Sequence, residues 1–481
     1  YEALTRTAEL DPNAPALRFC ADATCCRNTH CWSYAELVED ITRAANAFHD
    51  LGITPGEVLA FILPNLPETH FTIWGGEASG VVMAINPLQE AKQMAALLRA
   101  AKASVVVTLA PTPGSDLWPK LASQLDQLPE IKHVVWVDMG PYVDVTQRVL
   151  LASLAKQERE LHKGATIHEL RTLMDAQPGT HLKSDRQLRP EDRSSYFCTG
   201  GTTGLPKIAM RTHGAEVFNA WAMAAHMQPL GRSQVIFCGL PLFHVNAQLV
   251  TGRMPWTQGD HVILGTPNGY RGEGVIPRFW EMVEHFGINF FSGVPTVYSA
   301  LLQTGLEGRD LSSLRYAMCG AAPMPIELFR EFEDRTGVKI LEGYGLTEGA
   351  CVSSVNPPHG ERHIGSIGIR VAYQDMRAVM LDDAGEYLRD AGIDEVGLIT
   401  ITGPNLFEGY VEQSHNRGVW IEIDGQRWLN TGDLGRQDEN GYFWLTGRKK
   451  ELIIRGGHNI DPKQIEEALQ AHPAVAMAAA V

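Results

Sequence analysis

The sequence predicts an α/β fold in which helices cover both faces of a mostly parallel sheet. Two observations carry this prediction. Between residues 58 and 340, short apolar runs alternate with helix-forming segments, which is the pattern of repeated strand–helix–strand units. From about residue 375 the pattern changes to closely spaced strands separated by turn residues, which indicates a smaller all-β part.

The first region begins with a capped amphipathic helix at residues 33–52. Ser33 and Glu36 have the spacing of a capping box, and Gly52 can close the helix. The expected apolar stripe is Leu37, Ile41, Ala44, Ala45 and Phe48. The elements expected next are strand 58–63, helix 67–77, strand 81–85, helix 90–101, and strands 105–109 and 134–137. Residues 139–190 are expected to be a surface connector with helical patches at 149–161 and 167–174.

In the second region, a strand at 196–198 and a helix at 215–227 flank a run rich in Gly and Thr. The later strands are expected at 235–240, 261–264, 288–291, 316–318, 338–340, 377–381, 396–401, 420–423 and 442–445. Helices are expected at 277–286 and 325–336. The chain is expected to end with a helix at 462–471 and a strand beginning at 474.

Composition limits the classes of function. The 481 residues are 44% hydrophobic and 20% charged, typical of a soluble globular protein of two or three domains. No apolar run reaches the length of a membrane span, and no signal-peptide pattern is visible, so we expect a cytoplasmic protein. The chain starts at Tyr1 rather than Met, which leaves open a removed or unseen N-terminal segment. A net charge of −15 argues against nucleic acid as the main partner.

The run Phe-Cys-Thr-Gly-Gly-Thr-Thr-Gly-Leu-Pro-Lys at residues 197–207 is suited to a phosphate group. Glycines let the backbone approach a ligand, threonine hydroxyls and backbone N–H groups bind phosphate oxygens, and Lys207 adds a positive charge. The run is not a P-loop, because Leu205 and Pro206 separate Gly204 from the lysine and Ile208 follows it. An ordinary kinase is therefore disfavoured, and a plain polar turn is the alternative for this run alone.

Further motifs follow in a fixed order. They are Cys-Gly-Ala-Ala-Pro at 319–323, Gly-Tyr-Gly-Leu-Thr-Glu at 343–348, Trp-Leu-Asn-Thr-Gly-Asp at 428–433, Gly-Arg-Lys-Lys-Glu-Leu-Ile at 447–453 and Gly-His-Asn-Ile at 457–460. Together with the run at 197–207, they resemble the signatures of the adenylate-forming (AMP-binding) superfamily. That superfamily includes acyl-CoA synthetases, firefly luciferase and the adenylation domains of nonribosomal peptide synthetases. The chain looks most like an acyl-CoA synthetase.

The resemblance implies a large N-terminal AMP-binding domain at residues 1–448, built of two stacked α/β sheet subdomains and a small β-barrel at about 353–448. Residues 449–481 would form the hinge and the beginning of a small α+β C-terminal domain, whose remainder, with the family's second catalytic lysine, is absent from this sequence. The family also has a hairpin where Cys20, Cys25, Cys26, Cys31 and His30 cluster. We therefore favour a plain hairpin there over a metal or disulfide site. The single cysteines Cys198, Cys238, Cys319 and Cys351 are interpreted as buried thiols.

The implied reaction joins a carboxylic acid to ATP, giving acyl-AMP and pyrophosphate, and then transfers the acyl group to CoA. The expected cofactors are ATP and Mg²⁺, with CoA as co-substrate. No charged residue stands in the expected pocket segments, which favours a fatty or aryl acid. One alternative is the same adenylation with an acyl carrier protein or an intramolecular hydroxyl as acceptor. Another is a catalytically silent nucleotide-binding homologue. The acyl chain and the oligomeric state, for which a homodimer is one option, are not fixed by the sequence.

The resemblance also assigns roles to individual residues. Glu348 would bind Mg²⁺, Tyr344 would cover one face of the adenine, and Asp433 would accept the ribose hydroxyls. The expected catalytic residues are Lys207, His244, Thr347, Glu348, Arg448 and the hinge lysine Lys450. The expected nucleotide-binding residues are Thr199, Gly200, Gly201, Thr202, Thr203, Gly204, Lys207, Gly320, Ala321, Ala322, Gly343, Tyr344, Gly345, Thr347, Asp433 and Arg448. The expected acyl pocket contains His244, Val245, Asn246, Gly293, Val294 and Pro295, with Gly343 beside them.

Two positions depart from the family pattern. Gly200 stands where a serine is frequent, and Ile208 stands where a glycine is frequent. The first change removes one hydroxyl, and the second would stiffen the loop. Because both substrates are anions, the acidic chain must also place positive charge locally. The candidate cations are Lys207, Arg211, Arg448, Lys449, Lys450 and Arg455.

Overall fold

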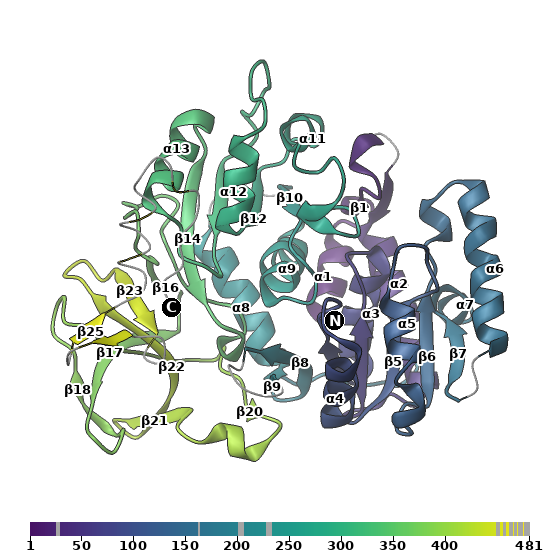
Figure 1. Ribbon diagram of the computed structural model, residues 1–481, viewed down its shortest axis with the longest axis horizontal. Helices are drawn as coiled ribbons and strands as arrows, with labels where there is room; N and C mark the ends of the chain where they lie inside the picture. Colours follow the sequence, from purple (N-terminus) through teal and green to yellow (C-terminus); the bar gives the residue numbers. More distant parts are fainter. Residues whose placement is uncertain are drawn as a thin grey trace. The chain divides into compact units, whose positions relative to one another are not determined.

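The computed structural model describes residues 1–25, 29–161, 164–200, 206–227, 233–448, 453–455 and 458–460, and the single residues 465, 469 and 475 (Figure 1). The chain divides into two compact units, which we treat separately. The first unit comprises Tyr1–Val217, Arg232–Val275 and Phe407–Glu412, and the second comprises Phe218–Gly231, Ile276–Leu406 and Gln413–Val481. Within these described parts, no helix is both long enough and apolar enough to cross a lipid bilayer.

The first unit contains an eight-stranded sheet with the strand order β20-β9-β8-β4-β3-β5-β6-β7. Its strands are β3 (Val58–Ile62), β4 (Val81–Ala84), β5 (Ala103–Leu109), β6 (His133–Val137), β7 (Thr166–Glu169), β8 (Arg193–Thr199), β9 (Lys207–Thr212) and β20 (Gly409–Tyr410). All neighbours from β8 to β7 are parallel, whereas β9 runs antiparallel to both β8 and β20. Every residue of β3 and β4 is buried, as expected for parallel strands covered on both faces.

The following helices of this unit match the sequence predictions, except that the short helix at 117–122 was not predicted. They are α2 (Tyr34–Asp50), α3 (Pro67–Ser79), α4 (Ala91–Ala101), α5 (Leu117–Ala122), α6 (Val145–Leu161) and α7 (Leu170–Asp175), while α8 (His213–His226) begins in this unit. The capping box of Ser33 and Glu36 at the start of α2 is confirmed, and the five expected stripe residues are buried. Gly75 lets α2 and α3 approach closely, since a Cβ at this position would lie 2.8 Å from the Cβ of Ala44.

A second group of strands in the first unit consists of β10 (Val235–Cys238), β11 (His261–Leu264), β1 (Pro15–Phe19) and β2 (His30–Ser33). β10, β11 and β1 are parallel neighbours, and β2 returns antiparallel to β1. The hairpin expected at the cysteine cluster is therefore confirmed. Within the described residues, no three His, Cys, Asp or Glu side chains are grouped so that they could hold a metal ion. Cys26 and the side chain of Cys25 lie outside those residues.

Four buried charged side chains link the elements of the first unit. Arg253, at the end of the π-helical turn Leu249–Arg253, donates hydrogen bonds to Glu77 on α3 and, at 2.6 Å, to Glu216 on α8. Arg211 on β9 is 3.2 Å from the same Glu216 carboxylate. Two positive and two negative charges thus balance in a buried site, which is the condition under which buried ions are tolerated. Arg211 is fully buried, so the expectation that it faces an anionic substrate is wrong.

Glu216 also fixes the start of β8. The hydroxyls of Ser194 and Ser195 donate to its Oε1 at 2.8 and 2.5 Å. One carboxylate therefore accepts hydrogen bonds from β8 and from the π-helical turn and forms an ion pair with Arg211 of β9. Because β8 and β9 form the hairpin that bears Thr199 and Lys207, this network holds the base of that hairpin.

The second unit contains the parallel strands β12 (Phe290–Gly293), β13 (Tyr316–Cys319) and β14 (Lys339–Gly345), followed by antiparallel β15 (Val352–Val355) and β16 (Ile369–Arg370). Its helices are α11 (Phe279–Phe286), α12 (Pro295–Leu302) and α13 (Ile326–Thr336). The strands and helices expected between residues 277 and 340 are therefore present, with boundaries shifted by a few residues.

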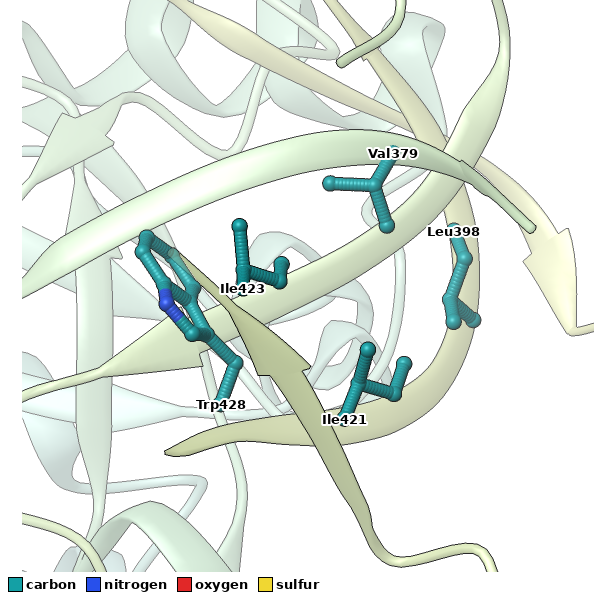
Figure 2. Close-up of a cluster of buried hydrophobic side chains, with 5 residues drawn as sticks. All are labelled: Val379, Leu398, Ile421, Ile423 and Trp428. Carbon is teal, nitrogen blue, oxygen red and sulfur yellow. The ribbon is translucent and has the colours of Figure 1, made fainter. Parts of the chain in front are cut away.

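A curled antiparallel sheet occupies the place of the expected barrel. Its order is β18-β17-β19-β22-β21, and β23 also pairs with β22. The strands are β17 (Asp375–Leu381), β18 (Tyr387–Asp390), β19 (Gly397–Thr402), β21 (Trp420–Ile423), β22 (Gln426–Gln437) and β23 (Phe443–Arg448). Figure 2 shows the side chains that the strands enclose: Val379, Leu398, Ile421, Ile423 and Trp428. Beyond it, β24 (Ile453–Arg455) and β25 (His458–Ile460) form a hairpin.

The structure corrects several expectations. Residues 207–212 form strand β9, so the Gly/Thr-rich run connects two antiparallel strands rather than a strand and a helix. Residues 166–169 form the edge strand β7 rather than part of a helix. Cys198 is half-buried, whereas Cys238, Cys319 and Cys351 are buried as expected. The helix expected at 462–471 and the strand expected from 474 lie outside the described residues, single positions apart.

We expect Arg253→Met to destabilise the first unit by about 3–5 kcal/mol, because the substitution takes from the buried Glu77 carboxylate its guanidinium partner and from Glu216 one of its two. Urea unfolding monitored by tryptophan fluorescence measures this loss. The control is Lys183→Met, which removes an ion pair between partly exposed side chains, Lys183 and Asp50, and should cost less than about 1 kcal/mol. Equal effects of the two substitutions would contradict the structural role of the buried network.

Candidate active site

The carboxyl ends of three parallel strands form one edge of the second unit. The register pairs Gly293 of β12 with Cys319 of β13, and Cys319 with Glu342 of β14. Gly320 follows β13, and a Cβ built there would lie 3.6 Å from the carbonyl oxygen of Gly343. Predicted pocket and nucleotide residues thus lie side by side at the edge where parallel α/β sheets bind ligands.

The loop after β13 presents exposed backbone at this edge. Ala321, Ala322 and Pro323 are exposed, and Ala321 has a φ of +67°, a left-handed conformation that is uncommon for a residue with a Cβ. The backbone N–H of Met324 donates to Glu342 Oε1 at 3.3 Å, which ties the loop to β14. The loop predicted to approach the adenine is therefore open to solvent within its own unit and is anchored at its far end.

The segment that carries Thr347 and Glu348 is a tight connection between β14 and β15. Both side chains are half-buried and lie in the 3₁₀ turn Thr347–Gly349. The Asn405 Nδ2 atom donates to the carbonyl of Gly349 at 3.0 Å, which fixes the end of the turn. At its beginning, a Cβ on Gly345 would lie 1.6 Å from the carbonyl oxygen of Cys351. Only glycine fits at position 345, for a steric reason that is independent of any ligand.

Three of the predicted nucleotide residues are in direct contact. The hydroxyl of Tyr344 on β14 donates to Asp433 Oδ2 at 2.5 Å, and Arg448 Nε donates to Asp433 Oδ1 at 2.8 Å. Asp433 and Arg448 are opposite each other in the register of β22 and β23. Residues from the motifs at 343–348, 428–433 and 447–453 therefore meet at one carboxylate.

Burial and charge determine the electrostatics of this group. Asp433 is 4% exposed, and the Arg448 side chain is 62% exposed, so an accessible cation balances a buried anion. Burial raises the pKa of Tyr344 well above its ordinary value, and the Asp433 carboxylate raises it further. The phenol therefore stays protonated at physiological pH and remains a hydrogen-bond donor to Asp433.

In the first unit, the ends of the hairpin carry the other predicted phosphate-binding groups. Thr199 and Lys207 are opposite each other in the register of β8 and β9, at the end of the first strand and the start of the second. The Lys207 ammonium lies 4.8 Å from the centroid of the Tyr410 ring, a cation–π contact that holds the lysine beside β20. Gly200 is exposed, and a Cβ built on it would contact nothing within 4 Å. Ile208 is buried in β9.

His244 and its neighbours also belong to the first unit. His244 is exposed and precedes the short helix α9 (Val245–Gln248), and its ring centroid lies 4.4 Å from that of Phe243. Val245 and Asn246 are half-buried, and the buried Oδ1 of Asn246 accepts no hydrogen bond from any described residue. The remaining pocket residues belong to the second unit, where Gly293 ends β12, Val294 caps α12 and Pro295 begins it.

Other predicted residues lie outside the described parts of the chain. These are Gly201, Thr202, Thr203, Gly204, Lys449 and Lys450, together with the side chain of Arg455. Sequence reasoning missed Glu342 and Tyr410. A glutamate inside the apolar strand 338–342 was a signal for Glu342, because buried carboxylates need a partner. No local signal identifies Tyr410, whose contact with Lys207 depends on a strand pairing across more than 200 residues.

The motifs and this geometry agree with a comparison against known families. The AMP-binding enzyme family matches residues 4–411. The chain belongs to this family. This match confirms the resemblance inferred from the sequence motifs.

Curated relatives cover nearly the whole chain. The marinolic acid–CoA ligase of Pseudoalteromonas sp. (strain SANK 73390) is 40% identical over 454 residues, which are 94% of this chain and 65% of that protein. The long-chain-fatty-acid–CoA ligase of Bacillus subtilis (strain 168) is 32% identical over 454 residues, which are 92% of this chain and 77% of that protein. The chain therefore spans about two-thirds of the length of the first relative and about three-quarters of the second.

Solved structures confirm the predicted fold class. An anthranilate CoA ligase in complex with anthranoyl-AMP superposes with a TM-score of 0.81 at 23% identity, covering 100% of this chain and 84% of that one. ATP-bound MatB from Rhodopseudomonas palustris superposes with a TM-score of 0.77 at 23% identity, covering 99% and 84%. At this level of identity the likeness establishes the fold.

We expect Gly345→Ala to weaken ATP binding and to destabilise the second unit by about 1–3 kcal/mol, because the new Cβ must displace the Cys351 carbonyl. Calorimetric titration with ATP and thermal unfolding measure the two effects. The control is Gly392→Ala, at an exposed position where an added Cβ meets its nearest atom at 3.6 Å. The idea that sterics fix this turn fails if Gly345→Ala binds ATP as tightly as Gly392→Ala does.

Proposed function

We propose that this chain carries the adenylation centre of an acid–thiol ligase, an acyl-CoA synthetase of the AMP-forming type. A carboxylic acid would react with ATP to give acyl-AMP and pyrophosphate, and CoA would then take the acyl group and release AMP. The observation that carries the proposal is the contact of Tyr344, Asp433 and Arg448 beside the exposed loop that follows β13. A flat ring, a buried carboxylate and a guanidinium are suited to a base, a ribose diol and a phosphate, respectively.

The chemistry requires that two anions meet. An oxygen of the acid attacks the α-phosphorus of ATP, the bond to the bridging oxygen breaks, and pyrophosphate leaves. The protein needs no covalent nucleophile, so its residues act by orientation and by stabilising negative charge. Lys207 supplies a cation for the departing β- and γ-phosphates, and Thr199 and the loop it begins supply hydrogen-bond donors. Thr347 would donate to the α-phosphate, and His244 would line the acyl pocket.

Glu348 fits the role of Mg²⁺ ligand. Its half-buried carboxylate lies in a tight turn beside Thr347, and Mg²⁺ in such enzymes takes one or two carboxylates together with phosphate oxygens and water. When bound, the ion neutralises charge on the phosphates. Glu348 would hold the ion, and Thr347 beside it in the turn would donate to the α-phosphate.

The nature of the acid is proposed from the relatives and from the expected pocket segments. The two relatives described above are named for marinolic acid and for long-chain fatty acids. The segments 244–246 and 293–295 contain no acidic or lysine/arginine side chain that could pair with a charged acyl tail. We therefore propose a fatty acid, ahead of an aryl acid. A cytoplasmic location fits an enzyme that consumes ATP and CoA.

The departures from the family pattern do not favour a catalytically silent protein. Ile208 is a buried residue of β9, so its side chain belongs to the core and not to the loop. Gly200 leaves open space at the first loop position, and Thr199 and Lys207 keep their opposed positions across the hairpin. The domain boundary near residue 448 and the hinge role of Lys450 remain part of this proposal.

The decisive experiment is a pyrophosphate-release screen of the full-length protein with short, long-chain and aromatic acids, with and without CoA. We expect pyrophosphate release with long-chain acids, and acyl-CoA only when CoA is added. Release of pyrophosphate and acyl-AMP without any CoA-dependent product would assign another acceptor. The absence of pyrophosphate release with every acid, in a protein that still binds ATP, would overturn the proposed activity.

We expect Glu348→Gln to slow adenylate formation by about two to three orders of magnitude, the effect of losing one well-placed electrostatic contact in a transition state. Raising the Mg²⁺ concentration should recover part of the rate, since the amide is a weaker ligand. The matched control is Glu327→Gln on α13, an exposed glutamate beside Arg330, which should leave the rate unchanged. A Glu348→Gln variant with normal turnover would remove Glu348 from its assigned role.

A further inference from the structure

Two described side chains donate hydrogen bonds to the Asp433 carboxylate. An ionised carboxylate offers about four lone-pair positions, two on each oxygen. Tyr344 occupies one position on Oδ2 and Arg448 occupies one on Oδ1. With respect to the described side chains, one acceptor position therefore remains on each oxygen, and a vicinal diol brings two hydroxyl donors. Because Tyr344 and Arg448 donate to different oxygens, each oxygen can accept a hydrogen bond from one ribose hydroxyl.

Two donors on different oxygens also prevent rotation of the carboxylate. Turning the group about its last bond would break both hydrogen bonds at once, and the donors come from different strands, β14 and β23. The backbone beneath is fixed as well. The Asp433 N–H donates to Thr431 Oγ1 at 3.1 Å, and the same hydroxyl donates to the carbonyl of Ile399 at 2.7 Å. Both the position of Asp433 and the plane of its carboxylate are therefore determined.

The same contact fixes the Tyr344 ring. The ring is attached at one end to β14 and held at the other by Asp433, so the long axis of the ring is fixed at both ends. A phenylalanine at this position would keep the strand attachment and the ring faces but lose the distal anchor. The tyrosine hydroxyl thus links a stacking surface to a carboxylate 89 residues later in the chain.

We propose that Tyr344 is a positioning residue for Asp433, and that its hydroxyl, in addition to its ring, sets how well the site distinguishes a ribose diol from a deoxyribose. The inference rests on the nucleotide site of the proposed function and adds to it a determinant of sugar specificity. Among the residues that the structure describes, Arg448 is the cation paired with the buried carboxylate. The role of the Tyr344 hydroxyl is therefore positional: its hydrogen bond keeps Oδ2 oriented toward the diol.

The test is a thermodynamic cycle in which the tyrosine hydroxyl is removed from the protein and one ribose hydroxyl is removed from the nucleotide. Equilibrium titrations measure the binding of ATP, 2′-deoxy-ATP and 3′-deoxy-ATP to the wild type and to Tyr344→Phe. We expect the wild type to prefer ATP over the deoxy analogues by about tenfold or more, the effect of one hydrogen bond to a charged group. In Tyr344→Phe this preference should shrink to within about threefold, because ATP loses affinity and the analogue lacking the affected hydroxyl loses little.

The matched control is Tyr316→Phe in the same unit. This substitution also removes a hydroxyl, one that donates to the Pro358 carbonyl at 3.1 Å, and it should preserve the preference for ATP. A merely structural role for Tyr344 would lower the affinity of all three nucleotides by the same factor, and that result would overturn the inference. A wild type that binds the three nucleotides equally would overturn it too.

Binding is measured without any acid, so the two proposals can fail separately. If no acid is activated but the ribose preference depends on Tyr344, the proposed ligase activity fails and this inference holds. If acids are activated and Tyr344→Phe keeps the full preference for ATP, the inference fails and the activity holds. In the active case, the variant should raise the KM for ATP far more than it lowers kcat, since the affected hydroxyls lie away from the reacting phosphorus.

Discussion

A buried carboxylate needs hydrogen-bond donors for its oxygens. In each unit this requirement holds together the strands that carry predicted substrate-binding residues. In the first unit, Glu216 accepts hydrogen bonds from β8 and from the π-helical turn and pairs with Arg211 of β9, and so holds the hairpin that bears Thr199 and Lys207. In the second unit, Asp433 gathers β14 and β23 in the same way. Leaving either group without partners would cost several kcal/mol, so the surrounding elements have little freedom to drift apart.

The two carboxylates serve different ends. Every described side chain that contacts Glu216 is itself buried, so this network is closed to solvent. Asp433 is bonded to an accessible arginine and to a half-buried tyrosine, and it keeps acceptor capacity on both oxygens. A closed network contributes rigidity, whereas a half-satisfied one beside an exposed loop is a place for a ligand with hydroxyl donors.

Local signals predicted most of the fold. The helix α2 was predictable to within two residues because its capping box, apolar stripe and terminal glycine all act within one segment. The strands β7 and β9 were not predictable in this way. Residues 166–169 resemble the helix that follows them, and they become a strand only because β6 offers hydrogen bonds. Residues 207–212 look like the exit of a loop until β8 and β20 are placed on either side.

The same distinction applies to the candidate site. Motifs named Tyr344, Asp433 and Arg448 individually, because each motif is contiguous in sequence. Their mutual hydrogen bonds depend on the register of β22 with β23 and on where β14 ends, which no single segment encodes. The contact of Lys207 with Tyr410 has the same origin. Sequence motifs therefore named the candidate residues, and tertiary pairing determined which of them touch.

The short strand β20 has a consequence for the synthesis of the chain. Its residues, Gly409 and Tyr410, complete the edge of a sheet whose other strands all lie before residue 213. On the ribosome, β9 must therefore wait with unpaired backbone groups while about 200 further residues are made, and an open strand edge invites association with other chains. Nascent chains that stall before residue 409 would be natural clients of chaperones that shield such edges.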